Sequence, residues 1–248
     1  MVSQPASESR LKPKAIISGQ SQAEGIAKFA SGTTYDGLTP ERRERLKISI
    51  LDSLACAINA IGAPPIAACL AQAKEFGGPN GRCTLIGGGK ADVVYAALYN
   101  TALVRYVDFM DSFLAGPELC HPSDNTGAVL AACEHAGRSG KEFLTALAIA
   151  YQVQSELTAS APFMERGFDI TAALPYSVGA GVAKALGLDD VKTAAAVEIC
   201  GQTGLQLLVA RTTPISQWKG LSSDGSQPRA VLKTPYPAEI AVVLWAGG

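Results

Sequence analysis

Apolar residues recur at three- and four-residue intervals through most of this chain, which is the spacing of one face of an α-helix. The clearest example lies between Thr39, a residue type suited to begin a helix, and Gly62, a type suited to end one. Its apolar face consists of Leu46, Ile50, Leu54, Ile58 and Ile61. The same pattern predicts helices over residues 66–76, 91–111, 122–136, 141–160, 171–186 and 191–208. We therefore predict an all-α fold with one multi-helix domain.

The breaks between these segments are rich in glycine, proline and acidic residues. Turns are predicted from GGPNGR at 77–82, RSG at 138–140 and GLDD at 187–190. The GGGK at 87–90 lacks the frame of a phosphate-binding loop because Ala91 follows Lys90, so a tight turn before a helix is the better interpretation. Asp189 or Asp190 can cap the last helix.

Both ends of the chain differ from its helical part. Residues 1–20 are polar and aperiodic, which predicts a flexible N-terminal arm, and residues 21–222 hold the helical domain. After residue 222 the sequence becomes polar and proline-containing, then ends in the apolar run IAVVLWAGG at 240–248. We interpret residues 223–248 as a divergent tail.

Composition narrows the class of partner. Apolar residues make up 48% of the chain and charged residues 17%, with a formal net charge of −1, so nothing favours a nucleic-acid partner. Residues 53–73 carry no charge but are interrupted by Gly62, Pro64 and Pro65, so no membrane span is expected. The N-terminus has no apolar segment typical of a secretory signal. We expect a protein of the cytoplasm or mitochondrial matrix, acting on a small molecule and forming a homodimer.

The six cysteines show no C-x-x-C spacing, so we interpret them as buried thiols in a reducing compartment. A metal set of Cys120, His121, Cys133 and His135 is disfavoured, because adjacent residues such as the first two diverge. No metal site and no iron–sulfur cluster are predicted.

Residues 105–125, RYVDFMDSFLAGPELCHPSDN, gather the densest set of reactive side chains. Asp108, Asp111 and Ser112 would share one face if this segment is helical. His121 precedes Pro122, so it reads as the cap of a helix, where main-chain amides attract anions and favour a neutral imidazole. The pattern predicts proton transfer on a carboxylate-bearing substrate. Two simpler interpretations stay open: His121 only caps the helix, and Arg105 only pairs with Asp108 one turn later.

Several segments together are similar to one known family. They are NTALVRYVDFMDSFLAGPELCHPSDN at 100–125, LDSLACAI at 51–58, SGKEFLTALAIAYQVQ at 139–154, GVAKALGL at 181–188 and WKGL at 218–221. Over about residues 22–222 the chain resembles the MmgE/PrpD family, which includes 2-methylcitrate dehydratases, cis-aconitate decarboxylases and an iminodisuccinate epimerase. The resemblance implies a large helical domain and a smaller α/β lid domain, and this chain is expected to lack the lid.

The resemblance also implies roles for individual residues. The family's active-site acid corresponds to Asp108, its hydroxyl to Ser112, its histidine to His121 and its lysine to Lys219. We expect Asp108, His121 and Lys219 to be catalytic, with Ser112 contacting the substrate. Further substrate contacts are expected from Arg105 and Ser123. One position departs from the pattern, because Ile170 stands in Gly167-Phe168-Asp169-Ile170-Thr171 where family members often have histidine.

The implied activity is a hydro-lyase of the 2-methylcitrate dehydratase type. Such an enzyme eliminates water from a 2-hydroxy tricarboxylate in propionate catabolism, and here it is expected to work without a cofactor. Two alternatives remain: a decarboxylase of a cis-aconitate-like acid, or a catalytically silent fragment, for which Ile170 and the expected absence of the lid are the sequence support.

Overall fold

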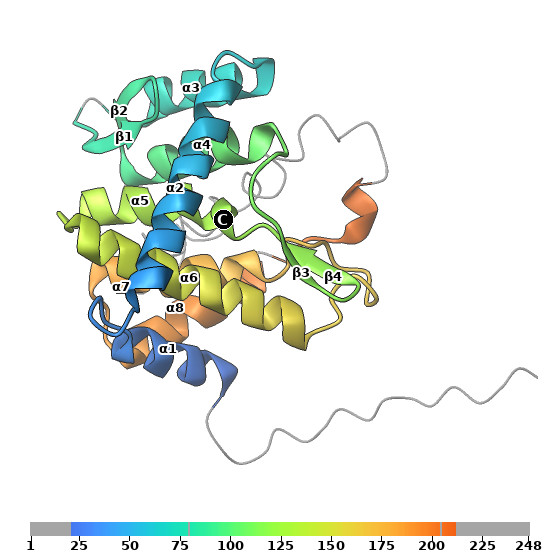
Figure 1. Cartoon of the computed structure of the whole chain (residues 1–248). Helices are drawn as coiled ribbons and strands as arrows, with labels where there is room; N and C mark the ends of the chain where they lie inside the picture. Colours follow the sequence, from blue (N-terminus) through green and yellow to red (C-terminus); the bar gives the residue numbers. More distant parts are fainter. Residues whose placement is uncertain (1–20, 79, 204, 212–248) are drawn as a thin grey trace, which may run out of the picture.

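The computed structural model describes residues 21–78, 80–203 and 205–211, and this part of the chain is mostly helical (Figure 1). The all-α prediction is confirmed. The described α-helices are α1 (Gln22–Gly32), α2 (Pro40–Ala60), α3 (Pro64–Phe76), α4 (Val93–Tyr106), α5 (Thr126–His135), α6 (Gly140–Ser160), α7 (Leu174–Leu186) and α8 (Asp190–Thr203). Two short 3-10 helices, η1 (Pro122–Asn125) and η2 (Leu208–Arg211), complete the helical part. The arm predicted over 1–20 and the tail predicted over 223–248 lie outside the described residues.

The helices pack as a chain of neighbours around a core rich in small side chains. Helix α4 packs on α5, α5 and α6 pack on α7, and α7 packs on α8, while α1 lies against α8 (Figure 1). Helix α2 crosses α4 and α6 on the outside. The core members with no more than 2% exposure include Ala96, Ala97, Ala102, Ala128, Ala131, Ala132, Ala146 and Ala150. Small residues at these positions allow the helix axes to approach closely.

The helix starts follow the chemistry of capping. Thr39 accepts a hydrogen bond from the Arg42 amide and begins α2, as predicted. The side chain of Asp189 accepts from the Lys192 amide at the start of α8. Ser139 and Glu142 form a reciprocal capping box at the start of α6.

Helix α1 was not predicted. It begins with a second reciprocal box, in which Ser21 and Glu24 each satisfy a main-chain amide of the other. The letters S-Q-A-E at 21–24 carry the signature of this box, so the sequence did hold the signal.

Two antiparallel hairpins project from the helical frame. Strands β1 (Cys83–Leu85) and β2 (Gly89–Ala91) pair around the glycines of GGGK, so the predicted tight turn is confirmed, with a short strand between it and α4. Strands β3 (Phe113–Ala115) and β4 (Glu118–Cys120) pair around Gly116 and Pro117. Gly116 has φ +64°, a conformation that glycine adopts readily at the first position of a two-residue turn. This second hairpin occupies a segment that was predicted to be a loop.

Four predicted helix boundaries were wrong. Helix α4 ends at Tyr106 rather than residue 111, because Asp108 takes a left-handed conformation with φ +55° that cannot continue a right-handed helix. The segment predicted as one helix from 122 starts as η1 and becomes α-helical only at Thr126. Helix α7 begins at Leu174, and α8 ends at Thr203.

All six cysteines lie among the described residues; every thiol is buried and none forms a disulfide. No single helix in the described ranges is long and apolar enough to cross a membrane. Helices α2 and α3 pass such a test only as a pair, by length and composition, with a 95° bend between them.

Candidate active site

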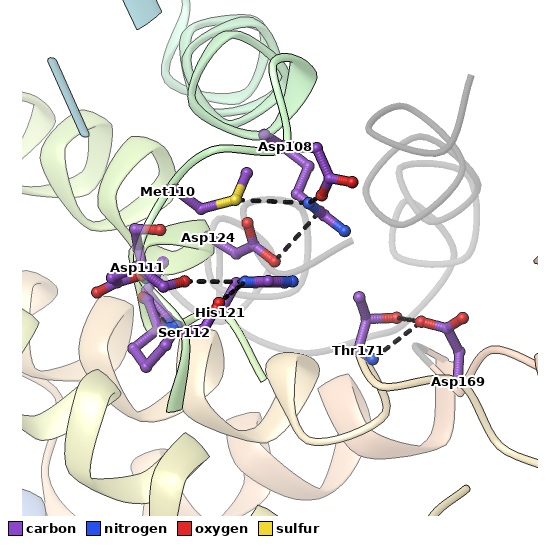
Figure 2. A network of polar contacts seen from close by, with 12 residues as sticks. Asp108, Met110, Asp111, Ser112, His121, Asp124, Asp169 and Thr171 are labelled. Atoms are coloured by element: carbon purple, nitrogen blue, oxygen red, sulfur yellow. Dashed lines mark hydrogen bonds and ion pairs between the residues drawn. The ribbon is translucent and has the colours of Figure 1, made fainter. Parts of the chain in front are cut away.

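The end of α4 places a buried arginine beside two carboxylates. Arg105 is 1% exposed, and its guanidinium contacts the carboxylate of Asp108 and lies 3.7 Å from that of Asp124, measured from Nε to Oδ2. Its Nη1 also lies 3.5 Å from the sulfur of Met110. Asp124 is as buried as Arg105, so the pair is held in a low-dielectric environment where breaking it would leave an uncompensated charge. The arginine thereby holds the chain after α4 against η1 (Figure 2).

Asp108 differs from its partners because its side chain is 40% exposed and its backbone is left-handed. This conformation costs a residue other than glycine roughly 1–2 kcal/mol, and aspartate is one of the few types that adopt it. The contact with Arg105 and the hydrogen bond from the Asp108 amide to the Arg105 carbonyl, at 3.2 Å, hold it there. A strained, partly exposed acid on a buried arginine is a candidate functional residue.

His121 is oriented by the main chain of the loop that follows α4. Its Nδ1 lies 2.8 Å from the carbonyl oxygen of Asp111 and 3.3 Å from the hydroxyl of Ser112. A carbonyl oxygen can only accept, so Nδ1 carries the proton in this contact. In the neutral ring Nε2 is then the atom with a free lone pair. Figure 2 shows this second nitrogen pointing away from Asp111, toward the side where Asp169 and Thr171 lie.

The loop and the histidine are also tied together by a carboxylate. Asp111 Oδ1 accepts a hydrogen bond of 3.0 Å from the main-chain amide of Ser123 in η1. Ser123 itself is buried, and its Oγ has no hydrogen-bond partner among the residues that the structure describes. An unpartnered buried hydroxyl of this kind is costly, so Ser123 is a position where a further group or a water would be stabilised.

A buried amide network anchors η1 to the helices behind it. The Asn125 side chain donates to Gln154 on α6 at 2.6 Å and accepts from the Ser177 hydroxyl on α7 at 2.8 Å. All three residues have no measurable exposure. These two bonds join η1 to α6 and α7, while Nε2 of Gln154 has no partner among the residues that the structure describes. The segment that carries His121 is thus anchored on two helices.

The segment that carries Ile170 forms a tight turn. Asp169 Oδ1 accepts from the Thr171 amide at 2.9 Å and from its hydroxyl at 2.8 Å, and the Asp169 amide donates to the Gln206 carbonyl. Ile170 is half-buried between the two buried polar residues. Its aliphatic side chain cannot take part in proton transfer at this position.

The carboxylates of the site raise the pKa of neighbouring buried groups. The pKa of the Cys120 thiol is raised to about 11, mainly by burial, while a hydrogen bond with Thr158 lowers it and the charges of Asp124 and Asp111 raise it. Burial likewise raises the pKa of Tyr151, with Asp111 adding to the shift. Both groups are therefore neutral at physiological pH. Neither is poised to act as a base.

The structure divides the predicted site residues into two groups. Arg105 and Asp108 form one with Asp124, while Ser112 and His121 form the other with Asp111 (Figure 2). The prediction that Asp108, Asp111 and Ser112 share a helix face was wrong. All three follow α4, and the turn at Asp108 directs the first toward Arg105 and the other two toward His121.

Two further outcomes concern individual predictions. Lys219 lies outside the described residues. Asp124 was missed by the sequence analysis, although its place in H-P-S-D-N directly after the histidine was a usable signal. Within the described ranges, no group of three or more His, Cys, Asp or Glu side chains is arranged to hold a metal ion.

Comparison with known proteins finds relatives that are named 2-methylcitrate dehydratase or alkylcitrate dehydratase. It is 29% identical over 223 residues to the 2-methylcitrate dehydratase of Escherichia coli (strain K12), covering 79% of this chain and 44% of that protein. It is 30% identical over 136 residues to the probable 2-methylcitrate dehydratase of Saccharomyces cerevisiae, covering 50% and 26%. An alkylcitrate dehydratase of a fungal species is 29% identical over 201 residues, covering 71% and 38%.

The chain spans less than half the length of these relatives. Residues 24–233 match the MmgE/PrpD N-terminal domain, the domain that carries the helices and the loop described above. Because this match extends over most of the sequence, the chain belongs to the MmgE/PrpD family.

Proposed function

We propose that this chain carries the active site of a hydro-lyase that eliminates water from 2-methylcitrate or a related 2-hydroxy tricarboxylate without a cofactor. The observation that supports it most is the orientation of His121, whose Nδ1–H is held by the Asp111 carbonyl at 2.8 Å. That bond leaves Nε2 as the proton acceptor on the side facing away from the loop. The names of the relatives, 2-methylcitrate and alkylcitrate dehydratases, favour the same substrate class.

The proposed step begins with Nε2 of His121 taking a proton from the carbon next to a substrate carboxylate. The electron pair of that C–H bond forms the double bond, and hydroxide leaves from the neighbouring carbon. The imidazolium formed at His121 is an acid, so it can return its proton to the departing hydroxide when both groups leave from one side. Ser112, 3.3 Å from the ring, supplies a hydroxyl that can bind a carboxylate oxygen.

The negative charge of a tricarboxylate must be balanced by cations, and the arginine of the cluster in Figure 2 already faces two carboxylates. Arg105 already faces the carboxylates of Asp108 and Asp124, and it is buried. We therefore propose that Lys219 supplies positive charge to the substrate, and that Arg105 acts by holding Asp108 in place. The expected homodimer and the cytoplasmic or mitochondrial compartment belong to the same proposal.

The test is to incubate the purified chain with 2-methylcitrate and follow the ultraviolet absorbance of the conjugated unsaturated acid. We expect the signal to grow for the wild type and for His135→Ala, since His135 is exposed at the end of α5. We expect His121→Ala to abolish it while the circular dichroism spectrum stays the same. His135→Ala is the matched control, because it removes the chain's other histidine.

Three results would contradict the proposal. Turnover retained by His121→Ala would remove this residue from the chemistry. A flat trace from folded wild-type protein would show that the described helical part and its tail are not sufficient for dehydration. Release of carbon dioxide from a cis-aconitate-like acid would assign decarboxylation instead.

A further inference from the structure

We infer that Asp111 is the positioning residue of His121: its main-chain carbonyl fixes the proton on Nδ1, and its carboxylate locks that carbonyl in place by capping η1. The catalytic meaning of this inference rests on the proposed function. Its structural content does not, because the position of a proton on an imidazole is measurable without turnover.

The two contacts of Asp111 form a closed loop of interactions. Residues 107–112 follow α4 without regular secondary structure, so the Asp111 carbonyl has no helix or strand to hold it. The 3.0 Å bond from the Ser123 amide to Asp111 Oδ1 joins this irregular segment to η1, two residues after His121. The 2.8 Å bond from Nδ1 to the Asp111 carbonyl then joins the same two segments a second time. Loss of the carboxylate removes one of the two bonds that join Asp111 to this part of the chain and leaves the bond to the imidazole.

The capping arrangement at η1 shows why a distant acid is used. His121 occupies the N-cap position, and its side chain makes no capping hydrogen bond. Residues at an N-cap ordinarily satisfy the amide of the second or third helical residue with their own side chain. Here Asp111, separated from Ser123 by 12 positions, satisfies that amide instead. The imidazole of His121 is thus released from capping and its Nε2 is left for the site.

The carboxylate of Asp111 acts electrostatically on buried groups near it. Burial raises the pKa of Tyr151 on α6, of Cys56 on α2 and of Cys120 at the end of β4, and the negative charge of Asp111 adds to each of these shifts. The contact that holds the carboxylate is its hydrogen bond from the Ser123 amide.

The decisive experiment is ¹⁵N NMR of histidine-labelled protein at a pH well above the usual histidine pKa of about 6.5. The chain has only two histidines, so His135→Ala assigns both ring signals. We expect His121 to be protonated on Nδ1 in the wild type. In Asp111→Ala we expect the proton to move mainly to Nε2, the usual form of an unrestrained imidazole. Where turnover is measurable, kcat should fall about 10- to 100-fold, with a smaller change in KM, because misplacement of a reacting group by about 1 Å has effects of that size.

Two further variants separate positioning from stability. Asp111→Asn keeps an oxygen that can accept from the Ser123 amide, so it should retain the Nδ1–H form. Thr39→Ala removes the cap of α2, where Oγ1 accepts from the Arg42 amide at 3.3 Å. It should lower stability by an amount similar to Asp111→Ala, while leaving the His121 tautomer unchanged.

The outcomes decide the inference in either direction. A wild type with the proton on Nε2 would overturn it, as would a folded Asp111→Ala protein that keeps the proton on Nδ1. If Asp111→Ala does not fold, Asp111→Ser serves instead, since its shorter side chain retains a polar group but does not span the distance to Ser123. A folded Asp111→Asn protein that loses the Nδ1–H form would also overturn the hydrogen bond as the link. None of these readouts depends on whether 2-methylcitrate is turned over.

Discussion

Gly127 lies where α5 crosses α4, and it should tolerate no side chain. A Cβ atom built there would lie 2.8 Å from the carbonyl carbon of Asn100 and 2.5 Å from Oγ1 of Thr101, and it would collide with the main-chain nitrogen of Thr101. Ordinary contacts between carbon atoms are about 3.5–4.0 Å. Gly127→Ala therefore forces the two helices apart by about 1 Å.

The size of the effect follows from two opposed terms. Overpacking of a dense core typically costs about 1–3 kcal/mol, and the upper end applies here because main-chain atoms cannot rotate away as a flexible side chain can. Alanine regains at most about 1 kcal/mol of helix propensity over glycine. The free energy of unfolding should therefore fall by about 2 kcal/mol, which corresponds to roughly 4–8 °C in Tm for a chain of this size. Because η1 leads directly into α5, the displaced helix should also move His121 and lower turnover.

The measurement is urea unfolding followed by circular dichroism, with Gly25→Ala as the matched control. Gly25 lies inside α1, and a Cβ there would meet nothing within 4 Å. The control should raise the free energy of unfolding by about 0.5–1 kcal/mol. A Gly127→Ala protein with a wild-type midpoint, beside a control that behaves as expected, would refute the close crossing of α4 and α5.

Two more predictions concern ionisable groups, the buried thiol of Cys133 and the partly buried amine of Lys184. Burial raises the pKa of the Cys133 thiol to about 12, so the folded state holds a proton that the unfolded chain loses near pH 9. The unfolded state then binds fewer protons than the folded state. Between about pH 9 and 12 this thiol should therefore lower the free energy of unfolding by about 1.4 kcal/mol per pH unit. A Cys133→Ala variant whose free energy of unfolding falls with pH as steeply as that of the wild type would contradict this. Lys184 donates to three main-chain carbonyls at the end of α1, at 2.8, 3.2 and 2.8 Å. Lys184→Met should lower the free energy of unfolding by about 1.5–3 kcal/mol and speed amide exchange in α1. The control is Lys28→Met, at an exposed position of α1, which should do neither.

The sequence was informative wherever one local rule decided the structure. Thr39 and Asp189 start their helices as their side chains predict, because capping is a contact between near neighbours. The glycines at 87–89 form the expected turn for the same reason. The capping box at Ser21 was equally local, and its omission was a failure to use a signal that was present.

The site was harder to predict because its contacts are not local. The helical pattern runs on past Tyr106, but the chain turns at Asp108, whose carboxylate contacts the buried guanidinium of Arg105. Arg105 in turn faces Asp124, which a sequence pattern cannot bring to it. The family resemblance named Asp108, Ser112 and His121, but it did not indicate that the first would lie apart from the other two. Spacing along the chain predicts which side chains are neighbours only within a helix, and α4 ends before these residues.

Helix α1 is held by elements that come much later in the chain. It packs on α8, and the carbonyl of Ala30 at its end accepts from Lys184, which lies 154 positions further on. A ribosome adding about 5–20 residues per second needs roughly 8–30 s to make that stretch. Until α6, α7 and α8 have been made, α1 has its capping box but lacks these packing partners, so its apolar face stays exposed beside a growing chain. Among the described helices, α1 is thus made before the others and is one of the last to be fixed, so a chaperone that binds nascent apolar segments would have its longest opportunity there.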